Sequence, residues 1–196
     1  MEDAELWLRF REGSEQAFSE LSQRYYRTLI HYGLKFTCDI QTIEDSLQEL
    51  LIRLWINRGN LKETPSVKFY LIKSFRHQLF LTFRKKHDYT QLSEELEPFY
   101  ADYSSEENYI RQESDLIFSN QVKGILDQLP PRQREVIFLR FFHNLSLEEI
   151  SSLLSINPQS VANIVQRSFH KLREIWPEHT ILPSVFVTLI QTLFLL

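Results

Sequence analysis

The chain has 196 residues, of which 43% are apolar and 24% are charged, enough for one or two soluble domains. Its four glycines and its single cysteine, Cys38, argue against hairpin-rich β folds, disulfide frameworks and cysteine-cluster metal sites. Because glycine is scarce, we expect an all-α protein. Met1 is not followed by a basic and then apolar signal segment, so we expect the protein in the cytoplasm.

The net charge of −4 is distributed unevenly along the chain. Residues 88–119 hold nine acidic side chains and one base, Arg111, which leaves 21 basic and 17 acidic side chains elsewhere. The sequence therefore predicts two mildly basic blocks joined by an acidic connector, a distribution that still permits a nucleic-acid partner.

The first basic block begins with two predicted helices. Residues 2–12 form a short helix that ends at Gly13, and Ser14 caps a longer one. The apolar residues of the longer helix recur at three- and four-residue steps, which indicates one buried face. They are Phe18, Leu21, Tyr25, Leu29, Tyr32 and Phe36.

A third helix is predicted over residues 42–58, opened by Thr42 and Asp45 as a variant of the capping box. Its apolar stripe is predicted to be buried and comprises Ile43, Leu47, Leu50, Leu51 and Leu54. The other sides of the helix combine carboxylates with Ile52 and Trp55, which suggests a surface for a protein partner.

Residues 59–65 are predicted to form a loop, and Thr64 with Pro65 starts a fourth helix that runs to His87. This helix interleaves aromatic and basic side chains, a combination that suits single-stranded nucleic acid because phosphates need cations and unpaired bases need flat apolar partners. Burial of most of these aromatics in a core is the alternative.

The connector, residues 88–113, is acidic and lacks sustained periodicity, so it is predicted to be a flexible tether. Two helices follow, over residues 116–129 and 132–142, separated by Pro130 and Pro131. The apolar tail from Thr180 to Leu196 is shorter than the roughly 20 residues that a membrane span needs. We expect the tail to pack as a helix on this protein or on a partner.

Residues 146–173 have the pattern of a helix-turn-helix. Ser146 and Glu149 form a capping box at the start of the first helix, and Asn157 followed by Pro158 starts the second. Ser151 supplies the small residue that close crossing of the two helices requires. The sequence therefore fixes both sides of a tight turn.

The second helix buries Val161, Ile164, Val165, Phe169 and Leu172 and turns a polar, basic face outward. Asn and Gln can pair with adenine edges, Arg with guanine, and Arg or Lys further along the helix with phosphates. An ordinary helical hairpin with a solvated polar face is the alternative.

Two stretches of the chain resemble a known family. The stretch LPPRQREVIFLRFFHNLSLEEISSLLSINPQSVANIVQRSFHKLRE resembles region 4 of bacterial RNA polymerase sigma factors. The stretches AFSELSQRYYRTL and IEDSLQELLIRLW resemble region 2, and the two-domain layout is similar to the extracytoplasmic-function (ECF) group. On this basis residues 1–87 and 114–177 are expected to be the two helical domains, with a linker at 88–113 and a tail at 178–196.

The resemblance implies a promoter-specificity subunit that binds core RNA polymerase and promoter DNA, needs no cofactor or metal, and is compatible with an anti-sigma partner. It implies three sets of site residues. The residues implied to read the upstream promoter element are Gln159, Ser160, Asn163, Gln166, Arg167 and Lys171. The residues implied to bind polymerase are Asp45, Gln48, Glu49, Ile52 and Trp55. The residues implied to act in promoter melting and in holding the downstream element are Asn57, Arg58, Asn60, Lys62, Lys73, Arg76, His77, Arg84 and Lys85.

Two other function classes are alternatives to a promoter-specificity subunit. A freestanding helix-turn-helix regulator would bind an operator as a dimer, and the region 2-like pattern argues against it because a regulator does not need such helices. An enzyme is the weakest interpretation, since the six histidines lack metal-site spacing and no phosphate loop or nucleophile motif is present.

Overall fold

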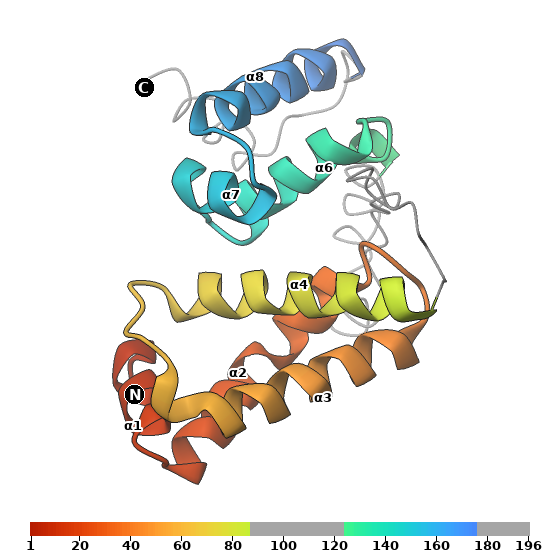
Figure 1. Ribbon diagram of the computed structural model, residues 1–196. Coiled ribbons are helices and arrows are strands. Elements are labelled where there is room, and N and C mark those ends of the chain that lie inside the picture. The colour runs from red at the N-terminus through yellow and green to blue at the C-terminus, as the bar shows by residue number, and fades with distance from the viewer. Residues whose placement is uncertain (87–123, 176–196) are drawn as a thin grey trace, which may run out of the picture.

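The structure is a computed structural model that describes residues 1–86 and 124–175. All regular elements in these ranges are helices, which confirms the all-α prediction (Figure 1). The first group comprises α1 (Asp3–Arg11), α2 (Glu15–Gly33), α3 (Ile40–Asn57), the 3-10 turn η1 (Arg58–Asn60) and α4 (Val67–Lys86). The second group comprises α6 (Pro131–Ile137), the π-helical turn η3 (Phe138–Phe142), α7 (Leu147–Leu154) and α8 (Pro158–Ile175).

The break between α1 and α2 follows from local chemistry. Gly13 has a φ of +102°, a conformation that glycine adopts without steric cost. The hydroxyl of Ser14 then accepts a hydrogen bond from the Ala17 amide and caps α2, as predicted. The two helices consequently pack against each other around the buried residues Trp7 and Leu21.

The predicted start of α3 at Thr42 is wrong. The helix begins at Ile40, and Asp39 is the cap, with its carboxylate accepting a hydrogen bond from the Thr42 amide. Thr42 is inside the helix and buried, and its hydroxyl donates to the same carboxylate. Asp39 is the cap because its carboxylate satisfies the otherwise unpaired Thr42 amide, so the helix begins at Ile40, two residues earlier than predicted.

The predicted start of α4 at Thr64 and Pro65 is also too early. The helix begins at Val67, and the hydroxyl of Ser66 accepts from the Phe69 amide in the first turn. Thr64 instead closes a short turn by accepting from the Ser66 amide. The loop after α3 is therefore slightly longer than predicted.

The first group is held together by the packing of α2, α3 and α4. Gly33 permits the closest approach, because a Cβ atom on Gly33 would lie 2.7 Å from Cγ2 of Ile43 on α3. Farther along α3, the Ser46 hydroxyl donates to the Thr82 hydroxyl of α4 at 3.0 Å. Small residues at these contacts let the three helices bury a common apolar core.

In the second group, the helix predicted over residues 132–142 forms with two differences. Pro131 occupies its first turn, where the missing amide costs nothing, and its last turn widens to π geometry. Asn144, with a φ of +55°, then turns the chain toward α7. Leu126, Leu129 and Leu172 join α8 to the residues before α6 in a small apolar cluster.

The two groups are in contact. Figure 1 shows α4 between the layer of α2 and α3 on one side and α6 and α7 on the other, with α8 beyond them. One continuous cluster of buried apolar side chains includes residues of both groups. Within the described residues no helix is long and apolar enough to cross a membrane. The predicted tether at 88–113, most of the helix predicted at 116–129 and the tail at 178–196 lie outside the described residues.

Candidate nucleic-acid interface

The start of the helix-turn-helix has the geometry that the sequence predicts. Ser146 accepts a hydrogen bond from the Glu149 amide, and the Glu149 carboxylate accepts from the Ser146 amide, so both halves of the capping box are present. The α7 helix then ends at Ser155, whose φ of +53° and ψ of +40° place it in the left-handed region. The chain can therefore reverse within a few residues.

Two side chains fix the turn between α7 and α8. The Ser151 hydroxyl donates to the carbonyl oxygen of Ile156 at 2.6 Å. The Asn157 side chain accepts from the Ser160 amide at 2.6 Å, and Pro158 fills the first position of α8. Val161 and Val165 are buried against α7, which sets the rotation of α8 about its axis.

That rotation leaves the six residues predicted to read DNA on the outer side of α8. Gln159, Asn163, Gln166 and Arg167 are exposed, and Ser160 and Lys171 are partly exposed. Gln159 donates to the Asn163 side chain at 3.2 Å, so the two amides form a pair on the helix surface. The N-terminal half of α8 thus presents the donors and acceptors that the major groove can pair with.

The residues predicted to bind polymerase lie along α3. Asp45, Gln48, Glu49 and Ile52 are exposed, and the side chain of Ile52 is 52% exposed. Ile56, one turn farther on, is 69% exposed and was not among the predicted residues. Carboxylates and an uncovered pair of isoleucines therefore share the exposed surface of α3.

Trp55 differs from the expected outward position. Its ring is half-buried, with its centroid 5.2 Å from the ring centroid of Phe18 and 6.4 Å from that of Phe10. The Arg58 guanidinium lies over the Trp55 ring, 4.4 Å from its centroid. Trp55 therefore stabilises the end of α3, and only part of it is available to a partner.

The loop after α3 is held by α1. The Trp7 indole donates to the carbonyl oxygen of Lys62 at 3.0 Å, and the Arg11 guanidinium donates to the carbonyl oxygen of Leu61 at 2.7 Å. Asn57 at the end of α3, and Asn60 and Lys62 after it, remain exposed. The backbone of the loop is thus anchored while its polar side chains face solvent.

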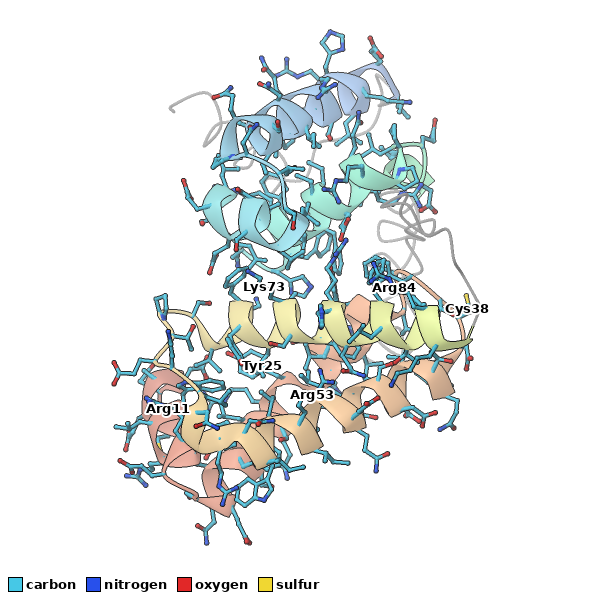
Figure 2. The ribbon with its side chains drawn as sticks, in the orientation of Figure 1. Arg11, Tyr25, Cys38, Arg53, Lys73 and Arg84 are labelled. Carbon is cyan, nitrogen blue, oxygen red and sulfur yellow. The ribbon has the colours of Figure 1, made fainter. Side chains whose placement is uncertain are left out.

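The remaining predicted residues lie on α4 and fall into two groups. His77, Arg84 and Lys85 are exposed, and Lys85 is 3.9 Å from Glu49 in a solvent-exposed ion pair. Arg76 is instead partly buried and binds Glu135 of α6, and Lys73, although exposed, donates to the Ser152 hydroxyl of α7. Figure 2 shows Lys73 on the side of α4 that faces α7.

Glu135 of α6 is the residue beside α4 that sequence reasoning missed. Its carboxylate is 0% exposed, accepts from Arg76 Nε and from the Tyr32 hydroxyl at 3.2 Å each, and lies 3.5 Å from Arg132. Burial and this carboxylate hold the pKa of Tyr32 well above its usual value, so the hydroxyl remains a donor. The sequence offers little signal for this role, because Glu135 follows the polar residues Arg132 to Arg134 and stands directly before the apolar run that begins at Val136.

Within residues 1–86 and 124–175, no group of three or more His, Cys, Asp or Glu side chains could hold a metal ion. The chemistry of the site is instead that of amides, guanidinium groups and ammonium groups presented by α8, α4 and the loop after α3. Such groups bind phosphates and base edges.

Two family models match the chain, one over each group of helices. The model described as Sigma-70 region 2 matches residues 21–88, and the model described as Sigma-70, region 4 matches residues 119–172. Among curated proteins, the RNA polymerase sigma factor YlaC of Bacillus subtilis is 22% identical over 160 residues, covering 81% of this chain and 91% of that protein. The ECF RNA polymerase sigma factor SigX of the same organism is 25% identical over 162 residues, covering 82% and 84%.

Solved structures show the same fold. CnrH, in complex with the cytosolic domain of CnrY, matches with a TM-score of 0.58 at 18% identity, covering 88% of this chain and 96% of that chain. The sigma factor RpoE of Bartonella quintana, in complex with the anti-sigma factor NepR, matches with a TM-score of 0.53 at 20% identity, covering 81% and 95%.

Proposed function

This chain belongs to the ECF group of RNA polymerase sigma factors, and from that premise we propose how its own residues divide the work of promoter recognition. The protein is a promoter-specificity subunit, which binds core RNA polymerase and recognises promoter DNA. We place its action in the cytoplasm with the polymerase, in a binding role without catalysis of its own.

The exposed face of α8 reads the upstream promoter element in the major groove. The observation that carries this assignment is the turn itself, in which the Ser151 and Asn157 hydrogen bonds fix α8 relative to α7. Gln159 and Asn163 at the N-terminal end then reach base edges, while Arg167 and Lys171 bind phosphates that fix the register. The six residues predicted from the sequence share this one surface.

The exposed surface of α3 docks on polymerase. Ile52 supplies an apolar contact, and we add Ile56 because it lies one turn away and is still more exposed. Asp45 and Glu49 give the surface an acidic rim, to which Gln48 adds a neutral amide, and this rim suits a basic partner helix in a helix-to-helix contact. Trp55 contributes indirectly, because its ring holds Arg58 and the end of α3 in place.

The loop after α3 and the polar side of α4 hold the opened strand of the downstream element. The loop is suited to this because Trp7 and Arg11 fix its backbone while Asn57, Asn60 and Lys62 remain exposed. Anchored polar loops lose little entropy when they capture an unpaired base. His77, Arg84 and Lys85 extend a basic surface along α4 for the strand backbone.

A protein partner that holds the factor inactive is consistent with its relatives. CnrH and the Bartonella RpoE were each solved in complex with another protein, CnrY in one case and the anti-sigma factor NepR in the other. We propose that an anti-sigma protein also binds this chain. The dimeric operator-binding alternative has no comparable support, since the region 2 match is unrelated to operator binding.

Co-elution with core RNA polymerase tests the α3 assignment. The unmodified chain is expected to co-elute, whereas Asp45→Arg and Ile52→Asp should each lose most of the binding. Glu12→Arg is the matched control, because it makes the same charge change at an exposed position outside α3 and should bind normally. Equal binding by all four proteins would contradict the assignment.

A further inference from the structure

Gln78 of α4 is a polar side chain in a largely apolar core. It is 1% exposed, and the neighbouring side chains of Phe75 and Leu79 on the same helix are apolar and fully buried. The Nε2 atom of Gln78 donates a hydrogen bond to Oε2 of Glu49 on α3 at 2.8 Å. A carboxylate only accepts hydrogen bonds, so the contact fixes which end of the amide faces Glu49. Gln78 therefore links the core to a residue of the polymerase-binding surface.

Stability does not explain the amide of Gln78. Its Oε1 atom is buried and accepts no hydrogen bond from residues 1–86 or 124–175. Burial of an unpaired acceptor destabilises a fold, and an apolar side chain of similar length would avoid that cost. The hydrogen bond between Ser46 and Thr82 already joins α3 to α4 one turn away. The distinctive contribution of Gln78 is therefore its contact with Glu49.

The carboxylate of Glu49 is engaged at both oxygens. Oε2 accepts from Gln78, and Oε1 lies 3.9 Å from Nζ of Lys85. The side chain of Lys85 is 71% exposed, so water and salt weaken this ion pair, and the buried amide determines the direction of the carboxylate. The side chain of Glu49 is itself 48% exposed. Glu49 thus combines an anchored oxygen with a surface that a partner can reach.

Anchoring matters for binding because a glutamate on a helix surface ordinarily occupies several rotamers. A partner that binds such a side chain must immobilise it, and the lost rotamer freedom weakens the complex. The hydrogen bond from Gln78 removes that freedom before the partner arrives. A carboxylate can accept several hydrogen bonds, so Glu49 still has acceptor positions for a basic group of the partner.

We propose that Gln78 is a positioning residue for polymerase binding, in which its buried amide orients the Glu49 carboxylate on α3 toward a basic group of the polymerase. This inference rests on the proposed function, because Glu49 belongs to the surface of α3 assigned to polymerase. It gives α4 a part in polymerase binding in addition to its part in holding the opened strand.

Gln78→Met separates positioning from a structural role. Methionine has a similar length and no strong donor, and it removes the unpaired acceptor from the core. The free energy of unfolding in urea should therefore stay equal or rise. The dissociation constant of the complex with core RNA polymerase should nevertheless increase about three- to tenfold. A merely structural glutamine would give lower stability and unchanged affinity of the folded chain.

A double-mutant cycle tests whether Gln78 acts through Glu49. Glu49→Ala alone should weaken polymerase binding, and adding Gln78→Met to it should change the dissociation constant by less than about twofold. Ser46→Ala is the control, because it removes the other hydrogen bond between α3 and α4. It should lower stability and leave polymerase affinity unchanged. Unchanged affinity in Gln78→Met, or additive effects of Gln78→Met and Glu49→Ala, would overturn the positioning role.

Nuclear magnetic resonance tests the contact even where Gln78→Met fails to fold. Glu49→Ala changes an exposed residue, and it should shift the side-chain amide resonances of Gln78. The side-chain amide of Gln128 donates to the carbonyl oxygen of Gly124 and should not shift. An unshifted Gln78 amide would overturn the proposal.

Failure of the proposed function is distinguishable from failure of the positioning role. Loss of co-elution of the unmodified chain with core polymerase would overturn the function. Normal binding by Glu49→Ala, with co-elution retained, would remove Glu49 from the polymerase-binding surface and overturn the role of Gln78 with it. Weakened binding by Glu49→Ala together with normal binding by Gln78→Met would overturn the positioning role alone.

Discussion

Ser151 and Ile156 are joined by a 2.6 Å hydrogen bond from the serine hydroxyl to the isoleucine carbonyl oxygen. The bond spans the turn of the helix-turn-helix and satisfies a backbone acceptor between two helices. Ser151 is small enough to let the helices cross and polar enough to fix the turn. The direction of α8, and with it the direction of the base-reading side chains, depends on this contact.

Ser155 ends α7 in a left-handed conformation, with a φ of +53°. A side chain in this region costs about 1 kcal/mol or more, so Ser155→Gly should raise the free energy of unfolding by about 0.5–1 kcal/mol. Urea denaturation followed by circular dichroism measures the change. Gly13→Ala is the reverse control, because a φ of +102° strains any side chain, and it should destabilise the protein. Destabilisation by Ser155→Gly would show that the turn needs the serine itself.

Gly33 should not tolerate alanine, although alanine favours helices. The added Cβ would lie 2.7 Å from Ile43 Cγ2 and 3.3 Å from Phe75, so overpacking should cost about 1–3 kcal/mol in urea denaturation. The control is Gly59→Ala, because no atom lies within 4 Å of its added Cβ, and the change should be within about 0.5 kcal/mol of neutral. Equal effects at the two positions would contradict the close α2–α3 approach.

His143 should make stability depend on pH. Burial, and after it the charges of Lys68, His31 and Lys35, lower the pKa of His143 from 6.5 to about 4. The folded chain therefore binds fewer protons than the unfolded chain between these values. The free energy of unfolding is therefore unaffected by His143 above pH 6.5 and decreases as the pH falls toward 4. The decrease is roughly 2 kcal/mol at pH 5.

The comparison for this pH effect is His143→Phe, which retains a ring beside Tyr32 and Phe138 but cannot titrate. Urea denaturation at several pH values should show the difference between the two proteins changing steadily below pH 6.5. Parallel curves for the unmodified chain and His143→Phe would contradict the buried, neutral imidazole.

Substitutions of the base-reading residues and of the phosphate-binding residues of α8 should have different effects on promoter binding. In the polymerase complex, Gln159→Ala should cost about 1–3 kcal/mol on the preferred promoter and relax the preference at one base pair. Arg167→Ala should weaken binding to all promoters alike and reduce the salt dependence. Competition binding at several salt concentrations distinguishes the two patterns. Identical patterns for both variants would contradict the division of roles along α8.

Local chemistry explains what could be predicted from the sequence. The capping box of Ser146 and Glu149, the Asn157 and Pro158 start and the break at Gly13 each depend on residues within four positions, and all three are confirmed. The start of α3 was mispredicted because two neighbouring residues can cap the helix. Burial of Thr42 against the core leaves Asp39 as the cap, and burial is not visible from local spacing.

The contact between the two groups of helices could not be predicted for a different reason. Arg76 and Glu135 are 59 positions apart, and the sequence around each residue does not identify the other as its partner. Trp55 was expected to be exposed for a related reason, because its burial depends on Phe10 of α1 and Phe18 of α2. Contacts between distant segments determine which of the predicted site residues are accessible.

The most direct test of the central claim is to map transcription start sites in vitro on genomic DNA from the source organism. Core polymerase with the chain should start at discrete sites that core alone does not use, and these sites should share an upstream element. A Gln159→Ala chain should change which of these sites are used. Identical start sites with and without the chain, or binding of the chain alone to duplex DNA as a dimer, would contradict its assignment as a promoter-specificity subunit.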